Sequence, residues 1–198
     1  MSISRNHLSA CILLVASMLH FQSALSCTTF QIHHEGGSSV GYSFAFQSGS
    51  GMVLINPRGL LKKAFVSPAD TAASWTSRFG SVTFNQIGRE FPYCGMNEKR
   101  LVITEMALDG TGYPSGDERP AVNELQWIQY HLDTCADLDQ VLSSCRRIRV
   151  AAVASKLHYM VCDAAGNCAS ISYRAGKLEI TEMASDAPHV MTLSLIHI

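Results

Sequence analysis

The sequence of 198 residues contains little charge and no cluster of basic residues. Only 16% of the residues are Asp, Glu, Lys or Arg, and the formal net charge is -1 at pH 7. Binding to nucleic acid or to an anionic membrane surface requires clustered Lys and Arg, so the composition favours neither partner. A disordered chain is also excluded, because 47% of the residues are hydrophobic. We therefore expect one globular domain.

The sequence also lacks a long apolar run and the common catalytic motifs. Its apolar segment at residues 8–19 is shorter than the roughly 20 residues that a membrane span requires, so no membrane anchor is expected. None of the eight histidines falls at a spacing typical of metal ligands, and no G-x-S-x-G elbow or nucleotide-binding loop occurs. These absences leave Cys27 as the strongest nucleophile candidate.

The N-terminus has the pattern of a secretory signal peptide. Arg5 supplies the positive charge, residues 8–19 (LSACILLVASML) the apolar region, and residues 24–26 (ALS) a cleavage site with small residues at both ends. Cleavage after Ser26 would make Cys27 the first residue of a periplasmic or secreted protein. Two alternatives stay open. Cys27 could be the lipid-carrying cysteine of a lipoprotein signal, although such a signal usually has Leu at the position of Ala24 and Gly or Ala at the position of Ser26. Cys27 could also be a purely structural cysteine.

Six cysteines remain after the predicted cleavage, in a compartment that permits disulfides: Cys27, Cys94, Cys135, Cys145, Cys162 and Cys168. Cys162 and Cys168 are the best candidate pair, because YMVCDAAGNCASISY reads as two strands joined by a short turn. A bond between Cys135 and Cys145 is less favoured, since the helical segment between them would hold them apart.

The order of predicted elements indicates an α+β fold. Residues 27–107 contain short segments rich in β-branched and aromatic residues and separated by turn residues, which predict strands: TTFQIHH (28–34), SVGYSFAF (39–46), GMVLIN (51–56) and SVTFN (81–85). Residues 121–132 (AVNELQWIQYHL) carry apolar residues at spacings of three and four, which predicts a helix, and a shorter helix is expected at about residues 137–145. Hairpin strands return over residues 157–180. Strands, helices and strands in this order favour separate layers over alternating βαβ units.

Cys27 at the N-terminus would combine a nucleophile and a base. Its thiol could attack a carbonyl carbon while its own α-amine, with an ordinary pKa near 8, accepts the proton. No separate histidine is required for this chemistry.

Several motifs in order resemble the choloylglycine hydrolase and penicillin V acylase family. They are CTTF at residues 27–30, GSGMVLINPRGLLKKA at 49–64, WTSRFGSVTFNQIGREFPYCGMNE at 75–98, RPAVNELQWIQYHLD at 119–133 and LHYMVCDAAGN at 157–167. The resemblance implies an αββα sandwich of antiparallel sheets, the N-terminal nucleophile (Ntn) hydrolase fold. It implies hydrolysis of linear amide carbon-nitrogen bonds, as in penicillin V, conjugated bile salts or acyl-homoserine lactones, without a metal or cofactor.

The resemblance also assigns site residues. The nucleophile of the family falls on Cys27, and a backbone donor to the oxyanion falls on Ala107. An arginine and an aspartate of the family pattern Gly-Arg-Asn-x-Asp fall on Tyr42 and Ala45. Phe44 is expected to line the acyl-binding pocket.

A second oxyanion donor of the family, an asparagine, would follow Thr192, where Leu193 stands. Residues 193–198 (LSLIHI) are interpreted as an artefactual tail, so the Ntn-hydrolase domain is assigned to residues 27–192 and is expected to be C-terminally truncated. Cys94 and Arg100 stand where the family pattern has glycine, which suggests a positive backbone φ at each position.

Two functions therefore remain open. The first is an exported amidase that uses Cys27 on a small-molecule amide. The second is a non-catalytic exported relative that binds acyl ligands, because Tyr42 and Ala45 replace the arginine and the aspartate. Family members are often tetramers, so a homo-oligomer is compatible with either function.

Overall fold

The computed structural model describes residues 27–46, 48–183 and 188–193. The predicted signal peptide at residues 1–26 and residues 194–198 of the predicted tail lie outside the described residues. The described part contains strands, two helices and no cis peptide bond.

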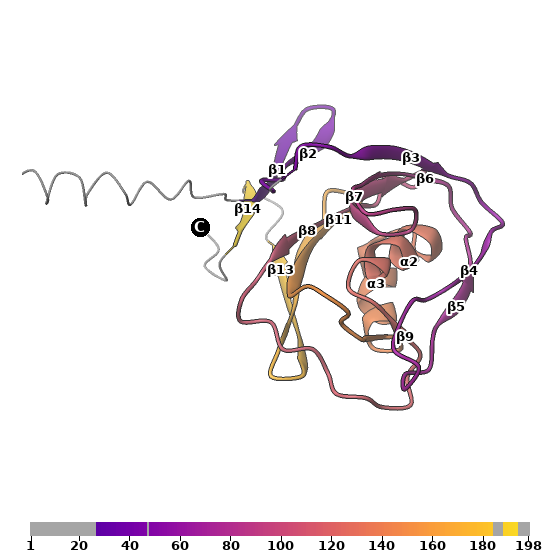
Figure 1. Cartoon of the computed structure of the whole chain (residues 1–198). Helices are drawn as coiled ribbons and strands as arrows, with labels where there is room; N and C mark the ends of the chain where they lie inside the picture. Colours follow the sequence, from indigo (N-terminus) through magenta and orange to yellow (C-terminus); the bar gives the residue numbers. More distant parts are fainter. Residues whose placement is uncertain (1–26, 47, 184–187, 194–198) are drawn as a thin grey trace, which may run out of the picture.

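A three-stranded antiparallel sheet carries the predicted N-terminus. Its order is β14 (His189–Thr192), β1 (Thr28–His34) and β2 (Gly37–Ser43). Strand β1 coincides with the expected segment TTFQIHH, and the hairpin that it forms with β2 stands out from the body of the molecule (Figure 1).

A seven-stranded sheet forms the body of the molecule, in the order β13-β12-β11-β8-β7-β6-β3. Its pairings are all antiparallel. In chain order its strands are β3 (Met52–Asn56), β6 (Ser81–Asn85), β7 (Pro92–Asn97), β8 (Val102–Ala107), β11 (Leu157–Cys162), β12 (Cys168–Arg174) and β13 (Lys177–Met183). The small hairpin of β4 (Leu61–Lys63) and β5 (Ser74–Thr76) lies beyond it.

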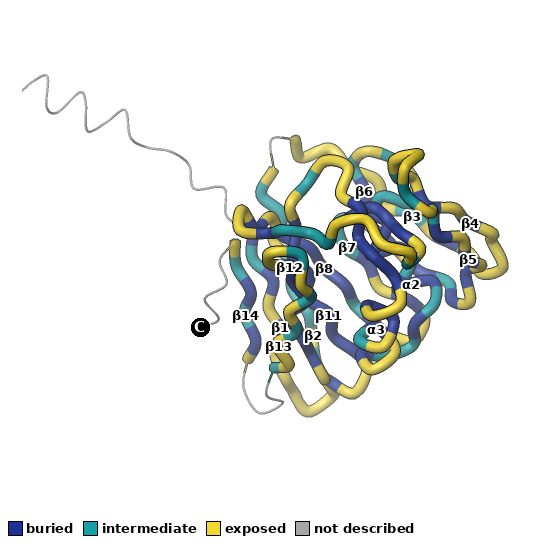
Figure 2. The backbone as a smooth tube through the Cα atoms, turned by 90° about the horizontal axis from the view of Figure 1, so that it is seen from below, coloured by how far each residue is buried: buried dark blue, intermediate teal, exposed yellow. Residues whose placement is uncertain are grey.

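Both helices pack against one face of the seven-stranded sheet (Figures 1 and 2). They are α2 (Gln126–Thr134) and α3 (Leu138–Cys145). Ile128 and Leu132 of α2 join Ile103 and Tyr159 of the sheet in the main core, and all four are fully buried. Trp127 stacks on Tyr159 with ring centroids 4.1 Å apart.

The first predicted helix was placed too early. Ala121–Val122 form strand β9, which pairs in parallel with β10 (Arg149–Val150). The side chain of Asn123 then accepts hydrogen bonds from the backbone N–H groups of Leu125 and Gln126, at 3.0 and 2.7 Å. This arrangement satisfies the first donors of the helix. The apolar spacing could not separate a buried two-residue strand from a helical turn, whereas α3 agrees with its prediction.

The other face of the seven-stranded sheet packs against the three-stranded sheet. A buried set of six residues joins the two layers, and we call it the sulfur-rich cluster: Cys27, Met106, Met160, Cys162, Cys168 and Met191. A hydrogen bond also crosses the layers, from the Thr104 hydroxyl of β8 to the Thr29 hydroxyl of β1, at 3.2 Å. The described residues thus form one helical layer and two β layers, as an α+β sandwich of this class requires. No helix covers the outer face of the three-stranded sheet within this part of the chain.

The predicted disulfide between Cys162 and Cys168 is present at the end of the β11–β12 hairpin. Cys135 and Cys145, the less favoured pair, are buried free thiols.

The two residues that replace glycines of the family pattern differ in backbone conformation. Arg100 has a φ of 64°, which confirms the expectation of a left-handed residue. Cys94 is not among the described residues with positive φ, so the expectation was wrong there. The sheet requires a glycine at the next position, Gly95. A Cβ on Gly95 would lie 2.7 Å from the side chain of Thr83 and 2.8 Å from a backbone oxygen.

Candidate active site

Cys27 lies immediately before β1, where the two sheets meet. Only 7% of the residue is exposed, and its thiol donates to the backbone oxygen of Ala45 at 3.8 Å. Burial raises the pKa of this thiol above its ordinary value. The neighbouring Glu105 raises it further, and the hydrogen bond to Ala45 lowers it. The thiol is therefore protonated near neutral pH, and it needs a base before it can act as a nucleophile.

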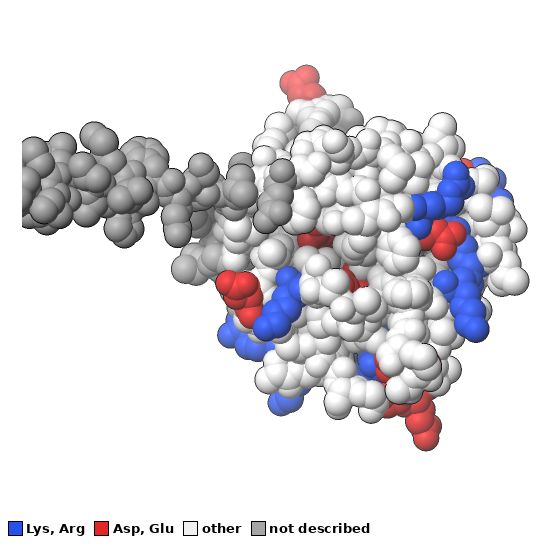
Figure 3. Space-filling model, in the orientation of Figure 1, with Lys and Arg blue, Asp and Glu red and all other residues white. Residues whose placement is uncertain are grey.

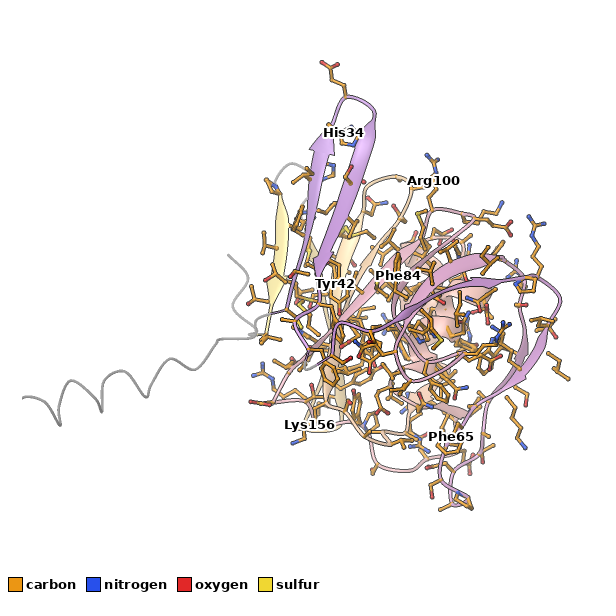
Figure 4. The ribbon with its side chains drawn as sticks, turned by 45° about the horizontal axis from the view of Figure 1, so that its top comes forward. His34, Tyr42, Phe65, Phe84, Arg100 and Lys156 are labelled. Carbon is orange, nitrogen blue, oxygen red and sulfur yellow. A yellow bond between two sulfur atoms is a disulfide. The ribbon has the colours of Figure 1, made fainter. Side chains whose placement is uncertain are left out.

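The residues that replace the arginine and aspartate of the family pattern lie beside Cys27. Tyr42 is paired with Thr29 in the β1–β2 ladder, and Tyr42 and Ala45 both pack against the sulfur-rich cluster. Tyr42 sits at the end of the hairpin nearest the body of the molecule, whereas His34 lies toward its outer end (Figure 4). The fold thus brings both positions to Cys27.

Position 193 also lies next to Cys27. The antiparallel register of β1 and β14 pairs Thr28 with Thr192, so one further step along the ladder places Leu193 opposite Cys27. Leu193 is 37% exposed. A side chain at this position is therefore well placed to reach a group bound at the thiol.

Ala107, the predicted backbone donor, is the last residue of β8 and pairs with Leu157. It follows Met106, which belongs to the same buried cluster as Cys27. This places Ala107 on the strand that passes the nucleophile, and its role as an oxyanion donor stays a prediction.

A cleft of about 610 Å³ opens between β2, the segment that follows it and strands β3, β6, β7 and β8. Phe44 lines the cleft, and its ring centroid lies 4.6 Å from that of Tyr93 and 5.5 Å from that of Phe46. Tyr42, Met52 and Phe84 are among the other lining side chains. The cleft is thus mainly apolar and aromatic, which suits an acyl group better than a charged ligand. The face shown in Figure 3 is likewise mostly uncharged, with scattered charged side chains.

Glu105 is a site residue that the sequence interpretation missed. It is 2% exposed, and burial raises the pKa of its carboxyl to about 8, while a hydrogen bond from Tyr42 lowers it. Its charge also acts on Cys27 and Tyr42. An acidic residue inside the otherwise apolar strand VITEMA was the available sequence signal.

Cys94 lines the same cleft, but it is a poor rival nucleophile. Burial raises the pKa of its thiol to about 12, with a further increase from Glu105. Nearly all of this thiol is therefore protonated at neutral pH.

Two further features were considered for the described residues: a cluster of metal ligands and a membrane-spanning helix. No group of three or more His, Cys, Asp and Glu among them is arranged to hold a metal ion. Of the helices in that part of the chain, none has the length and apolar character needed to cross a membrane.

Comparisons with known proteins agree on one family. No family model matches the chain. A penicillin V acylase from Pectobacterium atrosepticum is 29% identical over 119 residues, which cover 52% of this chain and 32% of that protein. The solved structure of penicillin V acylase from Agrobacterium tumefaciens is similar with a TM-score of 0.62 and 25% identity, covering 79% of this chain and 49% of that one.

A mutant of conjugated bile acid hydrolase from Clostridium perfringens shares the fold, with a TM-score of 0.67 and 16% identity. The match covers 79% of this chain and 51% of that chain. The chain therefore spans about half the length of these solved relatives. The ordered motifs, the layers and these comparisons lead to one conclusion: the chain is similar in sequence and fold to penicillin V acylases, and it shares its fold with a conjugated bile acid hydrolase.

Proposed function

We propose that the protein, once Cys27 is its first residue, hydrolyses linear amide carbon-nitrogen bonds of small molecules with apolar acyl groups. The observation that carries this proposal is the position of a buried Cys27 thiol next to Tyr42, which lines the aromatic cleft. Export to the periplasm or the exterior, with removal of residues 1–26, would create the N-terminal cysteine. The names of the relatives supply penicillin V and conjugated bile acids as first substrates to test, and acyl-homoserine lactones are a third class.

The reaction uses Cys27 as both nucleophile and base. Its α-amine takes the thiol proton, and the sulfur attacks the carbonyl carbon of the amide. The oxyanion that forms is stabilised by a backbone N–H group, for which Ala107 is the candidate. Collapse breaks the carbon-nitrogen bond, and the leaving amine takes the proton from the α-ammonium group. A water molecule then gives a proton to the α-amine, attacks the thioester and releases the carboxylic acid and the thiol.

The aromatic cleft supports an apolar acyl group as the recognised part of the substrate. Phe44, Phe46 and Tyr93 form a connected set of rings along it. A phenoxyacetyl group or a long alkyl chain would bury apolar surface there, at about 25 cal/mol per Å².

A second candidate function rests on Tyr42 and Ala45. Because these residues offer neither a guanidinium nor a carboxylate, the protein could bind acyl ligands without turnover. In that case Cys27→Ser would leave ligand affinity unchanged, and incubation with substrate would form no thioester.

The test is intact-mass analysis of the protein after expression with its own leader. We expect a chain that begins at Cys27 and gains the mass of the acyl group on incubation with penicillin V or a long-chain acyl-homoserine lactone. Cys27→Ser should gain no mass as a thioester, and the matched variant Cys94→Ser should behave like the parent. A folded and correctly processed chain that binds these ligands but never acylates would support the second function instead.

A further inference from the structure

The helical layer carries a second cleft, of about 530 Å³, between the end of α2 and one face of α3. Thr134 and Cys135 line it from the end of α2, and Ser143 and Ser144 line it from α3. The helices and the sulfur-rich cluster lie on opposite faces of the seven-stranded sheet. This cleft is therefore separate from Cys27, and its lining is mainly polar where that of the other cleft is apolar.

Two arginines line this cleft without a carboxylate partner. Neither Arg78 nor Arg147 forms an ion pair with a described residue. A guanidinium group carries five N–H donors. Arg78 uses one of them on the backbone oxygen of Thr134, at 3.3 Å, and Arg147 uses one on the Ser143 hydroxyl, at 2.6 Å. Most donors of both side chains are therefore available to a ligand.

These contacts hold both guanidinium groups at the wall of the cleft. The central carbon of the Arg78 guanidinium lies over the ring of Phe79, 5.2 Å from its centroid, a contact that uses the face of the group and not its N–H donors. Burial raises the pKa of the Cys135 thiol to about 11, and the charges of Arg147 and Arg78 both act to lower it. The two charges thus act on the same lining residue.

The cleft also contains a buried hydroxyl without a partner. Ser144 is 2% exposed and lines the cleft, but its side chain makes no hydrogen bond with any described residue. Leaving a buried hydroxyl without a partner is costly. An oxyanion within reach of the two guanidinium groups would supply the acceptor that this hydroxyl lacks.

The charge of the lining favours an anion. Asp139 is the single carboxylate among the described lining residues, against the two arginines. It lies in the first turn of α3 and is exposed, and it is not within ion-pair distance of either arginine. The cleft therefore keeps an excess of positive charge.

We propose that this cleft binds a phosphate group, either as the free ion or as part of a small phosphate ester. The guanidinium groups of Arg78 and Arg147 donate to the phosphate oxygens, and the Ser144 hydroxyl donates to another of them. Two guanidinium groups suit the double charge and the paired oxygens of a phosphate. In an ester, the organic part would occupy the space beside Tyr130, which also lines the cleft. The site does not depend on the proposed function.

The first measurement is a titration of the protein with inorganic phosphate, followed by NMR of the arginine Nε–H groups. At about pH 8 most phosphate is doubly charged. We expect saturable shifts for Arg78 and Arg147, and none for Arg146, which is exposed next to Arg147 but does not line the cleft. Shifts that do not saturate, or that chloride reproduces at equal ionic strength, would overturn the proposal.

The second measurement compares the phosphate affinity of variants. Arg78→Gln combined with Arg147→Gln should weaken binding by at least about tenfold, because charge-assisted hydrogen bonds are lost. Asp139→Asn should tighten it by about threefold, because a like charge is removed. Arg146→Gln is the matched control, since it removes the same charge one residue from Arg147, and it should bind like the parent.

Two results would contradict the site. Either the double variant binds phosphate like the parent, or Arg146→Gln weakens binding as much as the double variant does. If the double variant does not fold, Arg147→Gln alone decides, because Arg147 is exposed and its side chain bonds only to Ser143 among the described residues.

Phenyl phosphate distinguishes an ester from the free ion. If the site takes an ester, phenyl phosphate should bind more tightly than inorganic phosphate, and Tyr130→Ala should remove the difference. Equal affinities of the two probes in the parent would identify the free ion as the ligand. Failure of both probes to bind would overturn the proposal and leave the proposed function untouched.

Discussion

Position 193 offers the most direct test at the scale of a single residue. The register of β1 and β14 places Leu193 opposite Cys27, and the family pattern has an asparagine there as an oxyanion donor. Leu193→Asn would add a side-chain N–H group next to the developing negative charge, and one such donor is worth about 100-fold in rate. We therefore expect Leu193→Asn to acylate on Cys27 about 100-fold faster than the parent, measured by intact mass at fixed times.

Leu193→Asp is the matched control, because it has the size of asparagine but no N–H donor and adds a negative charge. It should be slower than the parent. If the Asn and Asp variants acylate at the same rate, the side chain at position 193 does not contact the oxyanion.

Residues differ in how far the sequence reveals their role. Cys27 could be singled out from the sequence, because a leader pattern and the cysteine that follows it are local features of the chain, and its role as a nucleophile stays a prediction. Phe44 was found through the resemblance, and the structure places it in the cleft lining. The position of Glu105 in the fold could not be predicted from the sequence, since it depends on how β8 packs against β1. These strands are joined by the hydrogen bond between Thr104 and Thr29, which are 75 residues apart in the sequence, and no local pattern indicates such a contact.

Helix α2 provides a prediction at the scale of an element. His131 is fully buried on this helix, and its Nδ1 lies 2.8 Å from the backbone oxygen of Trp127. Burial lowers the pKa of this imidazole to about 4, against an ordinary value of 6.5. Below pH 6.5 the unfolded chain takes up this proton and the folded chain does not, so stability falls as the pH falls toward 4. The loss from this residue should reach about 3 kcal/mol below pH 4.

Urea denaturation between pH 7 and pH 4 measures this effect, with His131→Gln as a variant that cannot titrate. The parent should lose more stability than the variant over this range, whatever the starting stability of the variant. Parallel losses would show that His131 becomes charged without cost in the folded protein. His34, exposed on the β1–β2 hairpin, is the control, and His34→Gln should keep the parental slope.

The elements themselves were largely predictable where their pattern was local. The strand segments at residues 28–34 and 81–85 have the expected bounds, and the Cys162–Cys168 hairpin closes as the short turn suggested. The start of α2 was wrong because the parallel partner of β9 is β10, about 28 residues later along the chain. Pairing at that distance is decided by the assembled fold, so an apolar spacing alone cannot show it.

At the scale of the whole molecule, the most distinctive surface is an apolar sheet face without cover. Strands β3, β6 and β7 pair so that their exposed apolar side chains share the face turned away from α2. These side chains are Val53, Ile55, Val82, Phe84 and Met96, with exposures between 40% and 76%. Contiguous apolar surface of this kind favours association in water. We therefore expect the 198-residue chain to associate with itself as its concentration rises.

Sedimentation velocity over a range of concentrations tests this expectation on the chain as it stands. Ile55→Lys combined with Phe84→Lys places two charges on the face, and this variant should stay monomeric at concentrations where the parent associates. Leu61→Lys is the matched control, because Leu61 is 79% exposed on the separate β4–β5 hairpin, and it should associate like the parent. Association that persists in the double variant would place the contact elsewhere, for example at the open edge of β3, where unpaired backbone groups can pair with another strand.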